Sequence, residues 1–148
     1  MPLSTETWPI AVALLQFAPV GRDGLSAQDA SPSVWEKAFH QVARAGFTDV
    51  DLTDTWVRLG DLSPERALEF GAAARSAGLG TPAVSLIRRS VIHARNGLDN
   101  LAYSHRAIDA AASIGAAVVS VGLHQELTPE QKEQLWFWTA PGLSLIHI

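Results

Sequence analysis

Hydrophobic and polar residues follow one theme that occurs three times along the chain. Each copy has an alanine-rich amphipathic stretch, then a glycine, then a short β-branched run: VARAGFTDVDL, AARSAGLGTPAVSL and AAASIGAAVVSVGL. The glycines Gly46, Gly78 and Gly115 are 32 and 37 residues apart, which is the length of a helix–strand unit. Glycine just past a helix suits the left-handed position there. The pattern therefore predicts repeated units in which a helix leads into a strand.

Polar residues that favour helix starts agree with this pattern. Ser33–Glu36 has the form of a capping box just after Pro32, and Ser63 and Thr128 each precede a proline. Helices are predicted over residues 33–45, 64–77 and 97–114, with a fourth after Thr128. The predicted apolar faces are Val34, Trp35, Ala38, Phe39 and Val42 in the first helix, Ala67, Leu68, Phe70 and Ala74 in the second, and Leu101, Ile108, Ala111, Ala112 and Ile114 in the third.

Four strands are predicted between these helices, over Ile10–Gln16, Thr48–Leu52, Thr81–Leu86 and Ala117–Val121. The first and fourth are apolar almost throughout, as strands covered on both faces are. Alternating strands and helices predict an α/β fold with parallel strands and right-handed crossovers. Two architectures fit about four such units: a complete doubly wound sheet, or the N-terminal half of a (β/α)8 TIM barrel. No GxGxxG or GxxxxGK[ST] nucleotide fingerprint follows any of the strands.

Composition narrows the class of protein. The 148 residues are 47% hydrophobic and 18% charged, which is typical of a globular domain. A net charge of −4 argues against binding to nucleic acid or to an anionic membrane. The chain has no cysteine, a basic leader is absent from its first residues, and no apolar run reaches about 18 residues. We expect a cytoplasmic protein that binds neither nucleic acid nor membrane.

Candidate site residues lie where the predicted strands end, because both architectures place their sites at that edge. His124 directly follows the fourth strand, where an imidazole could bind a metal, hydrogen-bond a sugar hydroxyl or transfer protons; capping the next helix is the alternative. Asp51 points into the barrel if Val50 and Leu52 pack against helices, and would then need a partner. Its alternative role is to bond local backbone amides.

The other strand ends offer weaker candidates. Gln16 and Phe17 end the first strand and could line a sugar pocket, and Ser85 lies at the end of the third. Asp54 is predicted to be a turn residue. Arg88, Arg89, His93 and Arg95 could hold a phosphate or could simply form a solvated loop. His40 and His105 fall within helices, and His105 shares a face with Leu101 and Ile108, which predicts a packing role.

The stretch AIDAAASIGAAVVSVGLHQELTPEQKEQLWFWTAPG, with AGFTDVDL and GLGTPAVSL before it, resembles the sugar phosphate isomerase/epimerase family, the xylose isomerase-like TIM barrels. The resemblance spans residues 10 to about 142. It implies a sugar or sugar phosphate substrate and a metal-assisted shift of a proton or hydride between adjacent carbons. It also implies a divalent metal (Mn, Mg, Co or Zn) in the full-length protein.

In that family the metal-binding residues and catalytic bases generally come from strands four or five to eight. The resemblance therefore implies that His124, Gln16, Asp51 and Ser85 shape the substrate pocket, that no metal binds in this fragment, and that the fragment alone is inactive. His124 is a weak metal candidate by likeness to the related AP-endonuclease type, a metal-dependent nuclease. That nuclease and a non-catalytic ligand-binding α/β domain are the alternative functions.

The end of the chain divides in two. Residues 1–142 are predicted to be a partial xylose isomerase-like barrel domain, an N-terminal fragment. Residues 143–148, LSLIHI, resemble translated sequencing-adapter DNA and are expected to be a non-native tail; a genuine apolar strand is the alternative.

Overall fold

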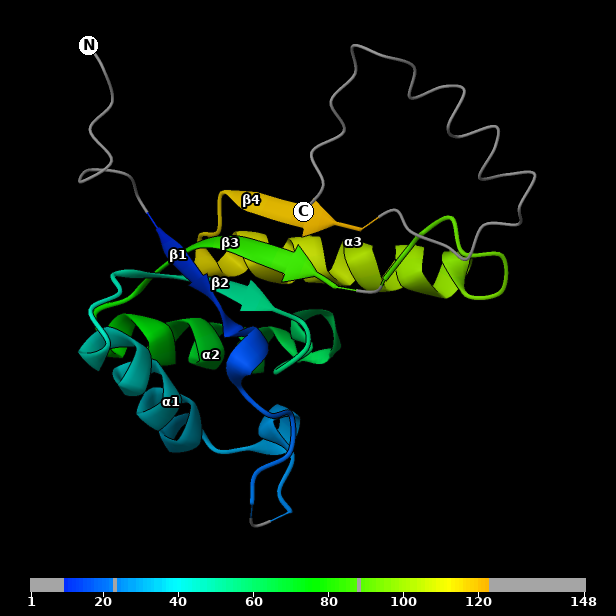
Figure 1. The fold of residues 1–148 in the computed structure, drawn as a ribbon. Helices are drawn as coiled ribbons and strands as arrows, with labels where there is room; N and C mark the ends of the chain where they lie inside the picture. Colours follow the sequence, from blue (N-terminus) through cyan, green and yellow to red (C-terminus); the bar gives the residue numbers. More distant parts are fainter. Residues whose placement is uncertain (1–9, 23, 88, 123–148) are drawn as a thin grey trace, which may run out of the picture.

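The computed structural model describes residues 10–22, 24–87 and 89–122 (Figure 1). The strands are β1 (Ala11–Ala13), β2 (Asp49–Thr53), β3 (Gly80–Leu86) and β4 (Val118–Val121). The α-helices are α1 (Pro32–Arg44), α2 (Pro64–Ser76) and α3 (Gly97–Ile114), and short 3-10 turns are η2 (Leu14–Gln16), η3 (Ala27–Asp29) and η4 (Leu59–Asp61). The predicted helices 33–45, 64–77 and 97–114 are confirmed to within one or two residues. The predicted fourth helix and residues 143–148 lie outside the described residues.

The strands form one parallel sheet in the order β1-β2-β3-β4 (Figure 1). Each strand is added at the same edge of the sheet. Since parallel crossovers are right-handed, this order places all connecting helices on one face and leaves the other face for the inside of a closed barrel. A doubly wound sheet reverses its order partway so that helices cover both faces. The described strands therefore form part of a (β/α)8 barrel, as predicted.

Of the two predicted helix starts within the described residues, the one at Ser63 is confirmed and the one at Ser33 is wrong. Ser63 is the N-cap of α2, and its hydroxyl accepts a hydrogen bond from Arg66 N at 3.3 Å. The capping box at Ser33 is wrong, because α1 begins one residue earlier, at Pro32, after Ser31. The fixed φ of proline suits the first helical position. The Ser33 hydroxyl instead contacts the Ser31 hydroxyl at 2.9 Å.

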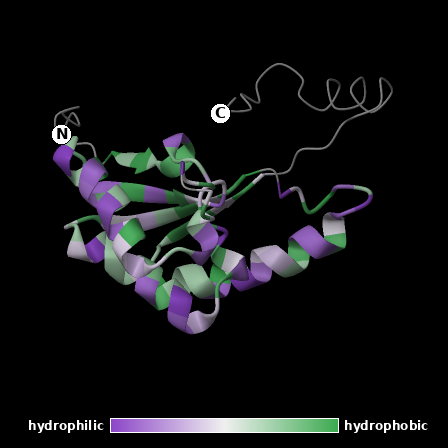
Figure 2. Cartoon of the chain, turned by 90° about the horizontal axis from the view of Figure 1, so that it is seen from below, coloured by the Kyte–Doolittle hydropathy of each residue, from purple (hydrophilic) through white to green (hydrophobic). Residues whose placement is uncertain are grey.

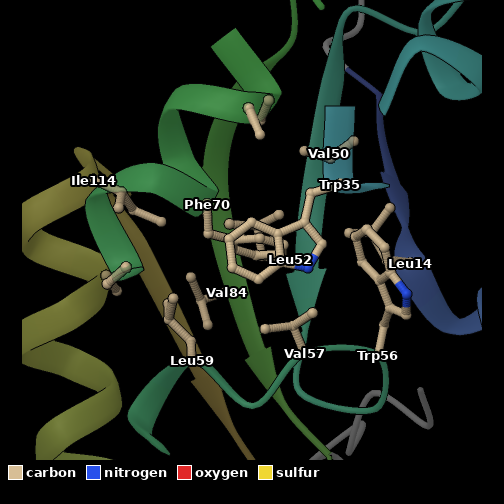
Figure 3. Packing of buried hydrophobic residues seen from close by; sticks show 14 of the residues in the cluster. Leu14, Trp35, Val50, Leu52, Trp56, Val57, Leu59, Phe70, Val84 and Ile114 are labelled. Atoms are coloured by element: carbon tan, nitrogen blue, oxygen red, sulfur yellow. The ribbon is translucent and has the colours of Figure 1, made fainter. Parts of the chain in front are cut away.

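The core lies between the sheet and its helices and is built around aromatic rings (Figure 3). Trp35 and Phe39 of α1 and Phe70 of α2 are at most 1% exposed, and Trp56 follows β2. Trp35 packs edge-on against Phe70, with the two ring centroids 5.0 Å apart. Edge-to-face pairs add about 0.5–1.5 kcal/mol beyond their buried area. This aromatic cluster fixes α1 and α2 to β2.

Several predicted buried positions are exposed. Val34, Leu68, Leu101 and Ile108 are 46%, 48%, 41% and 44% exposed, and His105 on the same face of α3 is exposed rather than packed. Figure 2 accordingly shows hydrophobic as well as hydrophilic residues along the helices. The buried faces of α2 and α3 use small residues such as Ala74 and Ala107, because small side chains allow close approach. Apolar spacing alone therefore chose some wrong positions, although Ala67, Phe70 and Ala74 of α2 and Ala111 and Ile114 of α3 are buried as predicted.

The predictions for the first and fourth strands need correction. β1 spans Ala11–Ala13, and residues Leu14–Gln16 form the 3-10 turn η2. Within the described residues β1 is half-buried throughout and β4 alternates between exposed and half-buried residues, so neither strand is covered on both faces. The exposed fraction of Val118 in β4 is 58%.

Gly60 gives a first test of this packing. A Cβ added there would lie 2.9 Å from Tyr103 O and 3.0 Å from Ala107 N, both in the backbone of α3. We expect Gly60→Ala to lower the free energy of unfolding by about 1–3 kcal/mol, because η4 and α3 must move apart. The exposed substitution Ala112→Ser should change it by less than about 0.5 kcal/mol. Urea denaturation of both variants checks this, and equal effects would contradict it.

Candidate functional site

The face of the sheet that the helices leave uncovered carries polar side chains. In β2, Val50 and Leu52 are at most 2% exposed, and they pack into the core with the helices. Side chains alternate along a strand, so Asp51 points to the opposite face. The sequence-based prediction that Asp51 points into the barrel is consistent with this arrangement. We call this uncovered side the inner face.

Asp51 and Ser85 meet on the inner face although 34 residues separate them. The Ser85 hydroxyl donates a hydrogen bond to Asp51 Oδ2 at 2.7 Å. Asp51 Oδ1 is buried and has no hydrogen-bond partner within the described part of the chain. No backbone amide of that part donates to Asp51, so its alternative role is not seen. A buried carboxylate oxygen without a donor is costly, and a ligand hydroxyl would satisfy it.

Asp54 forms a second polar link at the same edge of the sheet. Its carboxylate accepts from Ile87 N at 2.7 Å and from Arg89 Nε at 3.2 Å, and its side chain is only 2% exposed. Burial raises the pKa of Asp54, and the hydrogen bond from Ile87 and the charge of Arg89 oppose that rise. The prediction of a simple turn residue was incomplete, because it missed this bridge between β2 and the loop after β3.

Arg89 connects Asp54 to α3. Its guanidinium lies 4.3 Å from the centroid of the Tyr103 ring, a cation–π contact. Burial raises the pKa of Tyr103, and the nearby negative charge of Asp54 adds to the effect. His93 uses Nδ1 to accept from Arg95 N and Asn96 N, both at 3.2 Å, just before α3. Arg89 and His93 therefore hold the loop together, and the predicted phosphate site stays a prediction.

The remaining predicted site residues do not join this group. Gln16 is exposed in η2 and makes no hydrogen bond to Asp51 or Ser85. Phe17 packs against Trp56 with ring centroids 5.1 Å apart, which fits the alternative of core filling. His124, which was predicted to bind substrate and was a weak metal candidate, lies outside the described residues. The structure thus brings together Asp51 and Ser85 of the four candidates.

The long loop between β1 and α1 is fixed in place at this edge. Gln28 exchanges two hydrogen bonds with the backbone of Arg58: Gln28 Nε2 donates to Arg58 O at 3.1 Å, and Arg58 N donates to Gln28 Oε1 at 2.7 Å. Between the two loops is a pocket of about 280 Å³, lined by Asp54, Thr55 and Trp56 among others. A pocket of about 580 Å³ lies between the first loop and α1, and neither Asp51 nor Ser85 lines it.

The described residues do not by themselves fit a metal site. Within the described ranges, no group of three or more His, Cys, Asp or Glu side chains is placed to hold an ion. Asp51 supplies one unpartnered oxygen, which is fewer than the three protein ligands of a typical catalytic zinc site.

None of the helices between residues 10 and 122, in the part that is described, is both long and apolar enough to cross a bilayer.

The pH dependence of stability tests the environment of Asp54. Because its folded pKa is raised, the folded protein binds the proton more strongly than the unfolded chain does. This group's contribution to stability is then largest at low pH and falls as pH rises from the ordinary aspartate pKa of about 4 to the raised value. We expect Asp54→Asn to flatten this fall in urea unfolding measured across that range. Thr55→Val, which removes no titrating group, should keep the wild-type slope; equal slopes in wild type and Asp54→Asn would contradict the assignment.

Comparison with known proteins gives one informative match. The crystal structure of a xylose isomerase-like TIM barrel protein from Mycobacterium smegmatis in complex with magnesium superposes with a TM-score of 0.75 and is 44% identical in sequence. The match covers 92% of this chain and 44% of that chain, so this chain spans less than half the length of the protein it resembles. No family model matches the chain, and no curated protein does.

Proposed function

We propose, on the premise that this chain belongs to the xylose isomerase-like TIM barrel proteins, that it forms the first wall of a sugar-binding barrel. The complete protein would interconvert sugars or sugar phosphates by isomerisation or epimerisation. The observation that carries the proposal is the unpartnered Asp51 Oδ1 on the inner face of a chain 44% identical to a xylose isomerase-like protein. The chain spans less than half of that protein, so the activity belongs to the whole barrel.

In this proposal Asp51 and Ser85 bind and orient one substrate hydroxyl. Ser85 already donates to Asp51 Oδ2, which leaves Oδ1 to accept the hydrogen of a sugar hydroxyl. A hydrogen bond to a charged acceptor contributes about 1.5–3 kcal/mol. Holding one hydroxyl fixes the carbon chain relative to the other side of the barrel, where the remaining strands would supply acid–base groups.

The reaction itself needs groups beyond the described residues. In an aldose–ketose interconversion, one hydrogen moves from C2 to C1 and the proton of the C2 hydroxyl moves to the C1 oxygen. The relative was crystallised with magnesium, so we expect the complete barrel to bind a divalent metal. Asp51 and Ser85 do not complete a metal site, and their role here is to bind substrate.

An activity assay on the polypeptide that contains this chain and the remaining strands tests the proposal. The protein is incubated with pentoses, hexoses and their phosphates, with Mg²⁺ or Mn²⁺, in D₂O, and products are followed by NMR. We expect interconversion, and deuterium at the product carbon if a proton rather than a hydride moves. Cleavage of DNA at abasic sites without sugar conversion would favour the nuclease alternative and overturn the proposal.

A further inference from the structure

Asp54 occupies a particular place in the hydrogen-bond ladder between β2 and β3. In a parallel ladder, the residue that donates its N–H to one carbonyl accepts, through its own carbonyl, from the N–H two residues further along the partner strand. Asp54 N donates to Ser85 O at 3.2 Å, so the regular partner of the Asp54 carbonyl is Ile87 N. Ile87 N donates instead to the Asp54 carboxylate, at 2.7 Å. The side chain takes the place of the backbone carbonyl.

This substitution lets the two strands diverge without loss of a hydrogen bond. β2 ends at Thr53, and the chain then turns so that Trp56 enters the aromatic cluster. β3 continues to Leu86. The carboxylate that makes this possible is 2% exposed, and Arg89 lies beside it at 3.2 Å. An ion pair with one partner this buried gains little stability over apolar residues, so the role of Asp54 is better explained by the geometry that it sets.

Asp54 sets the position of Ser85. Asp54 holds the chain at and just after this residue: its backbone N–H donates to Ser85 O, and its carboxylate accepts from Ile87 N. Ser85 in turn donates to Asp51 Oδ2 at 2.7 Å, and this leaves Asp51 Oδ1 for a ligand. We propose that Asp54 is a positioning residue, which acts through Ser85 to orient the substrate-binding carboxylate Asp51. This inference rests on the proposed function for its consequence in catalysis, but its structural step does not.

Two substitutions of Asp54 separate its two contacts. Asn can still accept from Ile87 N, although it loses the charge that faces Arg89; Ala loses both contacts. We expect the amide of Ile87 in Asp54→Ala to exchange with solvent roughly tenfold or more faster than in Asp54→Asn, as measured by NMR hydrogen exchange in the 148-residue chain. Asp61→Asn, an aspartate exposed on η4 and paired with Arg58, is the matched control and should leave this amide unchanged. Equal exchange in Asp54→Ala and Asp54→Asn would overturn the proposal.

If Asp54 acts through Ser85, the effects of substituting these two residues on substrate binding should not be additive. In the complete enzyme, Asp54→Ala and Ser85→Ala should each raise KM by roughly tenfold, with kcat within about twofold, and the double variant should be no worse than Ser85→Ala alone. Asp54→Asn should restore most of the lost affinity. If the two effects multiply, Asp54 does not act through Ser85 and the proposal fails.

An inactive wild-type enzyme would overturn the proposed function without deciding the role of Asp54. In that case the coupling between Ser85→Ala and Asp51→Ala in urea unfolding decides it. The coupling should persist in the Asp54→Asn background and fall in Asp54→Ala; an unchanged coupling in both would overturn the positioning role.

Discussion

Trp35→Ala is expected to lower the free energy of unfolding by about 3–5 kcal/mol. Trp35 is fully buried, packs edge-on against Phe70 and lies 4.1 Å beneath the guanidinium of Arg66. Its indole N–H also donates to Ala27 O at 2.8 Å, which ties the β1–α1 loop to α1. Alanine would leave a large cavity, and the Ala27 carbonyl would keep only the longer hydrogen bond from Ala30 N at 3.4 Å. Urea denaturation followed by circular dichroism measures the loss.

Two control variants separate the contributions of Trp35. Trp35→Phe keeps most of the ring and removes the N–H donor, so a smaller loss of about 1–3 kcal/mol is expected from the lost hydrogen bond to Ala27 O and a smaller cavity. The neighbouring Val34→Ala, at a 46% exposed position, should cost less than about 1 kcal/mol. A Trp35→Ala variant as stable as Val34→Ala would contradict the packing described here.

Asp51→Ala is expected to raise KM of the complete enzyme for its sugar roughly 10- to 100-fold, from the loss of one hydrogen bond to a charged acceptor. Asp49→Ala is the matched control, because Asp49 lies on the same face of β2 but at the end of the strand away from the site, where it accepts from the Thr48 hydroxyl. Steady-state kinetics with both variants tests this. Equal KM values in Asp51→Ala and Asp49→Ala would show that Asp51 does not bind the substrate.

Local patterns predicted the elements well because their causes are local. Gly46, Gly78 and Gly115 all have positive φ, as the repeated motif indicated, and each follows a helix. The alternation of Val50, Asp51 and Leu52 was enough to place a carboxylate on the inner face. These features depend on residues that are neighbours in sequence, so the sequence displays them directly.

Contacts between distant residues were not predictable in this way. The bond from Ile87 N to Asp54 joins residues 33 positions apart, and it depends on the register of β2 and β3. Nothing in the sequence near Asp54 distinguishes it from an ordinary turn aspartate. The exposure of Leu68, Leu101 and Ile108 was missed for a similar reason, since the buried faces of α2 and α3 use alanines where the pattern favoured leucine or isoleucine.

The central claim is that the inner face around Asp51 binds a sugar, and a crystal structure of the complete barrel with Mg²⁺ and a linear five-carbon polyol tests it most directly. The account predicts a polyol hydroxyl about 2.5–3.0 Å from Asp51 Oδ1, with the Ser85 hydroxyl still donating to Oδ2. A polyol bound elsewhere, for example in the pocket beside α1, with Asp51 Oδ1 still unpartnered, would contradict it.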